Sequence, residues 1–154
     1  MGAAITMASG FYHSFTHDEI QQPIVAMIGG STFFHSGTAC LLNAVYNDSR
    51  FILVILDNEI TAMTGMEPTT GMGIRTDGSR GKAISLERVV AGCGVDFIEV
   101  FDPYAIKSMS GILKKATKYV KDPAGGIAVT IARHSCIIAY RNKAIPEPKK
   151  VTVT

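Results

Sequence analysis

The sequence has few cysteines, and none of them belongs to a Cys-x-x-Cys pair. The three cysteines, Cys40, Cys93 and Cys136, lie far apart along the chain. Zinc sites and iron–sulfur clusters are usually built from closely spaced cysteines, so the sequence gives no sign of either kind of site. The simplest interpretation is a reduced, cytoplasmic protein, because disulfides are rare in that compartment.

The sequence also lacks a long hydrophobic run and an excess of charge of one sign. Its longest apolar runs, such as residues 51–56, have the length of a strand, and its first residues lack the basic region and cleavage site of a signal peptide. Fifteen basic and 13 acidic residues are interspersed and leave a formal net charge of +2. We therefore expect no membrane span and no binding of nucleic acid.

What the sequence does contain is an alternation of short apolar runs with amphipathic segments. The chain has 154 residues, of which 47% are hydrophobic, enough to bury one ordinary core. We expect one domain over residues 1–140 and an exposed tail or linker over residues 141–154. Buried strands are expected at four places, residues 24–28, 51–56, 97–100 and 127–132.

Helices are expected between these strands. The first would begin near Ser36, the second at Ser85 and the third at Asp102, all residue types that cap helix N-termini. A loop rich in glycine and threonine, residues 66–82, falls outside the alternation. Strands that alternate with helices predict an α/β fold with three layers, α/β/α, and a mostly parallel sheet. Ligands bind at the carboxyl ends of the strands in such sheets.

A turn rich in glycine and hydroxyl groups follows the first expected strand. It reads Gly29-Gly30-Ser31-Thr32 and leads from strand to helix. Such a turn can bind phosphate, because free backbone N–H groups and the positive end of the helix both face the anion. A glycine pair after a strand is more often only a tight turn, so this feature alone leaves both interpretations open.

The pair Asp57-Asn58 at the end of the next strand favours the phosphate interpretation. Enzymes that use thiamine diphosphate (ThDP) share a G-D-G or G-D-S loop, followed one strand–helix–strand unit later by an N-N-like pair, and this chain resembles that motif. A closer resemblance, over nearly the whole chain, is to indolepyruvate:ferredoxin oxidoreductases. It rests on the motifs M-G-A-A-I, G-G-S-T-F-F-H-S-G, L-N-A-V-Y-N, L-D-N, T-A-M-T-G and I-A-R, which begin at residues 1, 29, 42, 56, 61 and 131.

The resemblance implies a binding site for ThDP and Mg²⁺. Asn58 would bind the metal through its side-chain oxygen and Ile60 through its backbone carbonyl, in keeping with the preference of Mg²⁺ for oxygen. Without the flanking motifs, Asn58 would be interpreted as a turn residue. The magnesium carboxylate of the family falls at position 30, where this chain has Gly30, and Asp57 is a possible substitute. The residues implied to bind the cofactor are Gly2, Ala3, Ala4, Gly29, Gly30, Ser31, Thr32, Thr61, Met63, Thr64 and Gly65.

The resemblance also implies a reaction and partners. The family decarboxylates 2-oxoacids oxidatively on ThDP, passes electrons to iron–sulfur clusters and transfers the acyl group to coenzyme A. Its activating glutamate belongs to a separate pyrimidine-binding domain and its cluster cysteines to a ferredoxin-like domain. We identify neither here, and no catalytic residue. We therefore expect a fragment or split-gene subunit that forms oligomers and is inactive alone. It would need the pyrimidine-binding domain, and a ferredoxin-like domain or ferredoxin, to act on an aryl or branched 2-oxoacid.

Three hypotheses about function remain open. The first is this ThDP- and magnesium-binding component of a 2-oxoacid:ferredoxin oxidoreductase. The second is a ThDP decarboxylase or synthase component that needs no ferredoxin. The third is a degenerate binding or assembly domain that has kept the fold and lost the metal site, and Gly30 is the feature in its favour.

Overall fold

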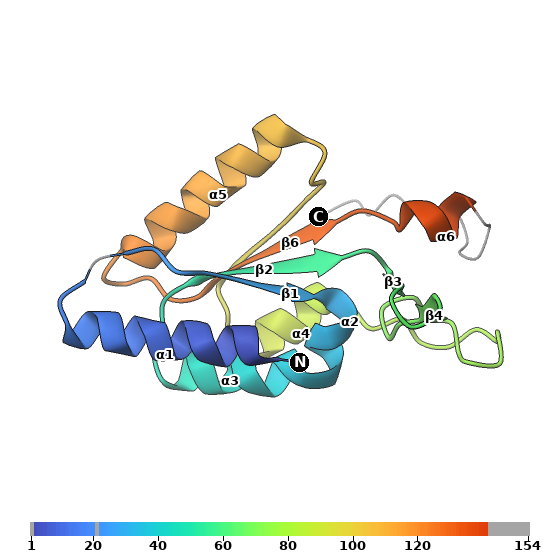
Figure 1. Cartoon of the computed structure of the whole chain (residues 1–154), viewed down its shortest axis with the longest axis horizontal. Helices are drawn as coiled ribbons and strands as arrows, with labels where there is room; N and C mark the ends of the chain where they lie inside the picture. The colour runs from blue at the N-terminus through green and yellow to red at the C-terminus, as the bar shows by residue number, and fades with distance from the viewer. Residues whose placement is uncertain (1, 21, 142–154) are drawn as a thin grey trace.

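A parallel sheet lies at the centre of the computed structural model, which describes residues 2–20 and 22–141 (Figure 1). Its strands lie in the order β1-β2-β6-β5, and each neighbouring pair is parallel. The four strands expected from the sequence are confirmed. They are β1 (Val25–Gly29), β2 (Ile52–Asp57), β5 (Phe97–Phe101) and β6 (Ala128–Arg133).

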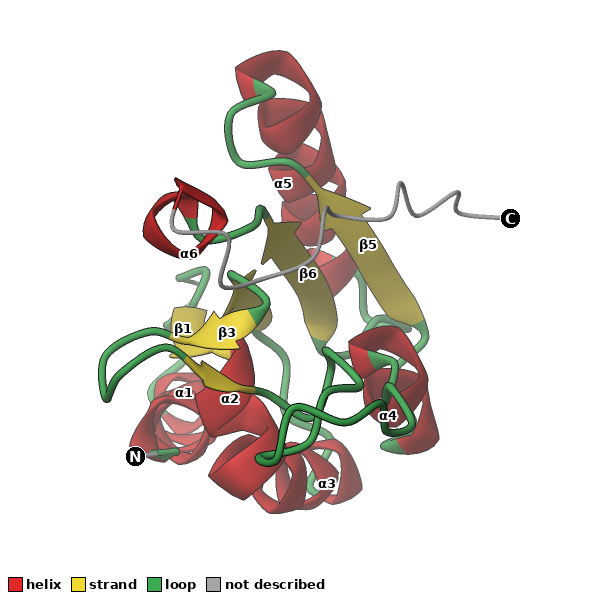
Figure 2. Ribbon diagram, turned by 90° about the vertical axis from the view of Figure 1, so that its right-hand side faces the viewer, coloured by secondary structure: helices red, strands yellow, loops and turns green. Residues whose placement is uncertain are grey.

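Helices cover the two faces of the sheet unequally (Figures 1 and 2). Three lie on one face, namely α1 (Ala3–His17), α3 (Thr38–Tyr46) and α4 (Leu86–Gly92). On the other face α5 (Ile106–Lys121) packs against β5 and β6 and makes few contacts with β2. The three-layer α/β/α fold is thus confirmed, with one outer layer much thinner than the other.

The two faces have separate cores because side chains alternate along each strand. On β2, Leu53 and Ile55 are fully buried in the larger core, whereas Ile52 packs in the smaller core beneath α5. Edge strand β1 lies beyond the reach of α5. As a result Val25 and Met27, which point to that face, are each 57% exposed.

The sequence pattern did not predict α1. Its N-cap is Gly2, which makes no side-chain capping bond, and the segment includes Gly10 and several β-branched or aromatic residues that favour helix weakly. Burial stabilises the helix despite this weak propensity, since Ile5, Ala8 and Ser9 are buried against the rest of the domain. Most helical stability in proteins comes from such packing.

Two helices begin at other residues than expected. The segments α2 (Gly30–Thr32), η1 (Phe33–Gly37, a π-helix) and α3 follow one another without a break, so helical structure begins at Gly30 and not near Ser36. Likewise α5 begins at Ile106, because the Asp102 carboxylate accepts the Tyr104 N–H at 2.9 Å and forms a turn before the helix. The expected cap of α4 is confirmed, since Ser85 Oγ accepts the Arg88 N–H at 3.2 Å.

A small hairpin and an extended loop follow β2. Strands β3 (Ile60–Thr61) and β4 (Glu67–Pro68) pair antiparallel, so the expected loop over residues 66–82 includes β4. It also contains an isolated antiparallel bridge between Ile74 and Arg80. Helix α6 (Ile137–Arg141) follows β6, and residues 142–154 of the expected tail lie outside the described residues. In the described ranges no helix is both long and apolar enough to span a membrane.

Candidate functional site

The glycine- and hydroxyl-rich turn forms the N-terminus of a helix. Gly29 ends β1 in an extended conformation (φ −73°, ψ 147°) and caps the helix, so Gly30, Ser31 and Thr32 are its first three residues. The first N–H groups of a helix have no acceptor within it. Since Ser31 and Thr32 are only half-buried, this turn presents backbone N–H groups and two hydroxyls at the carboxyl edge of the sheet.

A close approach at Gly37 shapes the π-helix behind this turn. A Cβ at Gly37 would lie 2.8 Å from Phe33 Cδ2 and 3.1 Å from Ile28 Cδ1, so only glycine fits there. Phe33 is itself fully buried. Short π-helical turns are frequent at functional sites, and this one holds the helix start against the end of β1.

The N-terminus of α1 lies beside this helix. Gly2 has φ +78°, a conformation that favours glycine, and a Cβ there would lie 3.0 Å from Ser36 Oγ. Ala3 and Ala4 are the first helical residues after it. Gly2, Ala3 and Ala4, which the resemblance implies to bind the cofactor, thus begin a helix close to the first one.

A hydrogen bond joins the helix start to the hairpin after β2. Ser31 Oγ and Thr61 Oγ1 are 2.9 Å apart, which brings two of the implied cofactor residues into contact. Further along the hairpin, Thr64 Oγ1 donates to Glu67 Oε2 at 2.7 Å. Met63 lies in the same turn and is 98% exposed, so the structure does not pack it against the other implied site residues.

The end of β2 forms two successive side-chain turns. Asp57 Oδ1 accepts the Glu59 N–H at 3.1 Å, and Asn58 Oδ1 accepts the Ile60 N–H at 3.3 Å. Between them Glu59 has φ +61°, in the left-handed region. Asn58 is exposed, and its side-chain oxygen keeps a second lone pair.

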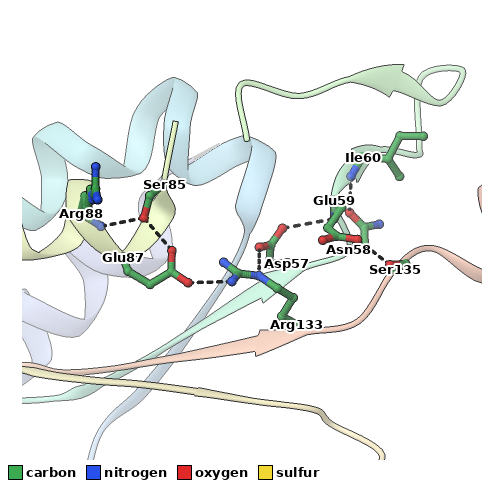
Figure 3. A network of polar contacts seen from close by, with 9 residues as sticks. All are labelled: Asp57, Asn58, Glu59, Ile60, Ser85, Glu87, Arg88, Arg133 and Ser135. Atoms are coloured by element: carbon green, nitrogen blue, oxygen red, sulfur yellow. Dashed lines mark hydrogen bonds and ion pairs between the residues drawn. The ribbon is translucent and has the colours of Figure 1, made fainter. Parts of the chain in front are cut away.

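Arg133, at the end of β6, links this turn to α4 (Figure 3). Its Nε donates to Asp57 Oδ2 at 2.7 Å, and its Nη1 donates to Glu87 Oε1 at 2.6 Å. Burial by itself would lower the pKa of Arg133, but the hydrogen bonds and charges of both carboxylates outweigh it and raise that pKa. Burial by itself would raise the pKa of Glu87, but the hydrogen bonds from Arg133 and Ser85 outweigh it, so that pKa is lowered.

Sequence reasoning missed this network. Arg133 belongs to the I-A-R motif, to which the sequence assigns no role. Glu87 lies in the first turn of the helix expected to begin at Ser85. Both side chains line a groove of about 970 Å³ between the long loop, α4 and α5, whose apolar lining includes Ile84, Val100 and Ile112. The only sequence signal was a charged residue at the end of an otherwise apolar strand.

The oxygen donors near Asn58 suit a hard cation only in part. The Asn58 side chain and the Ile60 carbonyl are neutral oxygens of the kind that Mg²⁺ accepts. Asp57, the possible substitute carboxylate, has one oxygen on Arg133 and the other on the Glu59 N–H. Within the described residues, no group of three or more His, Cys, Asp or Glu side chains is arranged to hold a metal. In the described part of the chain, the helix start thus offers backbone N–H groups and hydroxyls, whereas both oxygens of Asp57 already have protein partners.

Comparison with known proteins identifies the family to which the chain is similar. Residues 1–128 match the family described as "Thiamine pyrophosphate enzyme, C-terminal TPP binding domain". The chain is similar to indolepyruvate oxidoreductase subunit IorA of Archaeoglobus fulgidus, with 43% identity over 99% of this chain and 23% of that protein. It is also similar to IorA of Methanothermobacter marburgensis, with 40% identity over 90% of this chain and 21% of that protein.

A solved structure has a similar fold. It is a putative thiamin diphosphate-dependent enzyme isolated from Mycobacterium smegmatis, which aligns with a TM-score of 0.61 and 17% identity over 88% of this chain and 22% of that chain. At this identity the likeness concerns the fold alone. The chain spans less than a quarter of the length of the curated relatives described above.

Proposed function

This chain belongs to the family of C-terminal TPP-binding domains of thiamine pyrophosphate enzymes, and from this premise we propose that it binds the diphosphate and the magnesium ion of ThDP in an oxidoreductase of the indolepyruvate type. The observation that carries the proposal is the contact of Ser31 with Thr61. It brings the helix start at Gly30 and the turn after β2 together at one edge of the sheet, which is where ligands bind in such folds.

The diphosphate would bind at the helix start. The N–H groups and hydroxyls of Ser31 and Thr32 are donors to its oxygens, and the positive end of a long helical segment favours its charge. Gly29 and Gly30 let the anion approach the backbone closely. Gly2, Ala3 and Ala4, at the N-terminus of α1, would add a second set of N–H groups, and residues 61–65 would lie beside the thiazolium ring.

Magnesium would bind to neutral oxygens of this chain. Asn58 would supply its side-chain oxygen and Ile60 its carbonyl, and the diphosphate and water would complete the six positions that the ion prefers. We propose that Asp57 stays paired with Arg133 and is not a ligand. The chain should therefore hold the metal weakly, because Gly30 leaves the position of the family's carboxylate vacant.

The reaction would be oxidative decarboxylation of an aryl or branched 2-oxoacid to an acyl-coenzyme A. ThDP, when bound, supplies the electron sink for decarboxylation. This chain's residues would fix the diphosphate and so orient the cofactor. The activating glutamate would come from a pyrimidine-binding domain, and the iron–sulfur clusters from a ferredoxin-like domain or from ferredoxin. The working enzyme would be an oligomer.

Titration of ThDP into the purified chain, with and without Mg²⁺, tests this function. We expect weak, magnesium-dependent binding and no turnover of indolepyruvate by the chain alone with viologen as acceptor. Turnover without a partner would show that the site is complete in this chain. Its absence, together with metal-dependent binding of ThDP, would support a component that needs the rest of the enzyme.

The second candidate is a degenerate domain that serves binding or assembly only. Gly30 and the pairing of Asp57 favour it, because position 30 carries no carboxylate and both oxygens of Asp57 already have protein partners. The same titration separates the two functions, since a degenerate domain would bind ThDP neither with Mg²⁺ nor without it.

A further inference from the structure

A short segment after β6 holds the turn that would carry the metal. We call residues 57–60 the metal loop and residues 133–136 the clamp segment. Two backbone hydrogen bonds join them, from His134 N to Asp57 O at 3.0 Å and from Cys136 N to Asn58 O at 3.1 Å. They extend the contact between β2 and β6 past the last paired residues, Asp57 and Arg133.

Between them Glu59 is held at two points, its N–H by Asp57 Oδ1 and its carboxylate by the clamp segment. With φ +61° it has a conformation that costs free energy in every residue except glycine. Ser135 Oγ donates a hydrogen bond of 2.5 Å to Glu59 Oε2, and both side chains are half-buried (Figure 3). Ser135 thus provides a side-chain hydrogen bond from the clamp segment to the strained residue.

We propose that Ser135 is a positioning residue for the metal loop, an inference that rests on the function proposed above. By holding the Glu59 carboxylate, Ser135 stabilises the left-handed turn between Asn58 and Ile60. That turn sets the relative position of the Asn58 side chain and the Ile60 carbonyl, the two proposed ligands. Residues that orient metal ligands commonly affect metal affinity without touching the ion.

Four variants test the proposal: Ser135→Ala, Ser135→Thr, Glu59→Gly and the double variant Ser135→Ala/Glu59→Gly. The first readout is hydrogen exchange in the ligand-free chain, which reports local opening. We expect Ser135→Ala to speed exchange of the Glu59 and Ile60 amides at least about tenfold and to leave that of Leu53, in the middle of β2, unchanged. Ser110→Ala, at an exposed position of α5, is the matched control and should change neither.

The second readout is the magnesium-dependent affinity for ThDP. Ser135→Ala should lower it about tenfold, at the lower end of the range for residues that orient metal ligands. Ser135→Thr keeps the hydroxyl and should retain the affinity. Glycine adopts the left-handed conformation without cost, so in the Glu59→Gly background the further change Ser135→Ala should have little effect, a non-additivity that simple loss of stability would not produce.

Two results would overturn the positioning role. One is Ser135→Ala with unchanged exchange at Glu59 and Ile60 and unchanged affinity. The other is an effect of Ser135→Ala that persists in full when residue 59 is glycine. If the unmodified chain shows no magnesium-dependent binding of ThDP, the proposed function fails, and the role in metal positioning fails with it; the exchange rates then report separately whether Ser135 holds Glu59.

Discussion

The carboxylate of Asp57 faces Gly30, and its Oδ1 lies 3.2 Å from the point that a Cβ on Gly30 would occupy. Asp57 ends β2, and Gly30 begins the helix directly after the neighbouring parallel strand β1. A side chain at position 30 would therefore extend toward the turn that carries Asn58. The resemblance places the family's magnesium carboxylate at this position, and that role stays a proposal for this chain.

Gly30→Asp should tighten magnesium-dependent binding of ThDP by at least about tenfold, or roughly 1.4 kcal/mol, because it restores a carboxylate beside Asn58. Without metal, the new charge stands against Asp57, and the variant should be less stable than the unmodified chain. The measurement is ThDP titration and thermal unfolding, each with and without Mg²⁺. Gly30→Asn, which fills the same space without charge, is the control. Equally tight binding by the unmodified chain would mean that another group supplies the carboxylate.

Arg133→Met should destabilise the fold by about 3 kcal/mol, the lower end of the range for removing one partner of a buried ion pair. The side chains of Arg133 and Asp57 are only 18% and 17% exposed, and Met leaves two carboxylates without their cation. Urea unfolding at neutral pH measures the loss. Arg88→Met, at an exposed position of α4, should change stability little. A loss for Arg133→Met no larger than for this control would contradict the structural role of the network.

Acid should weaken the domain partly through Glu87. Its pKa in the folded chain is lowered, so the stability that it contributes is complete above the pKa of an unfolded glutamate, about 4.3, and is lost as the pH falls through the lower folded value. The unmodified chain should therefore lose more stability between pH 5 and 3 than Glu87→Gln does. Urea unfolding across this range tests the difference, and parallel pH dependences of the two proteins would refute it.

The uncovered face of β1 should make the isolated chain associate. Val25 and Met27 lie on the same face of an edge strand, each 57% exposed, and parallel sheets are normally covered on both faces. Light scattering should show self-association that Val25→Thr/Met27→Gln reduces. Met63→Gln, at the 98% exposed position in the hairpin turn, should not reduce it. A strictly monomeric unmodified chain at high concentration would be the opposite outcome.

Sequence alone determined the parallel sheet and the position of the candidate site. Apolar runs such as residues 51–56 are too short for helices and alternate with amphipathic segments, and this local pattern also fixes which residues follow each strand. The turns at Gly29–Thr32 and Asp57–Asn58 could therefore be placed at one edge. The roles given to individual residues there came from a family resemblance and stay proposals.

Only the tertiary structure decided what holds these residues. Helix α1 escaped prediction because burial of Ile5 and Ala8 stabilises it against weak local preference. Asp57 meets Arg133, and Glu59 meets Ser135, across 76 positions of sequence in each case. No local pattern encodes such pairs, because they depend on the pairing of β2 with β6, which brings the ends of two distant strands together.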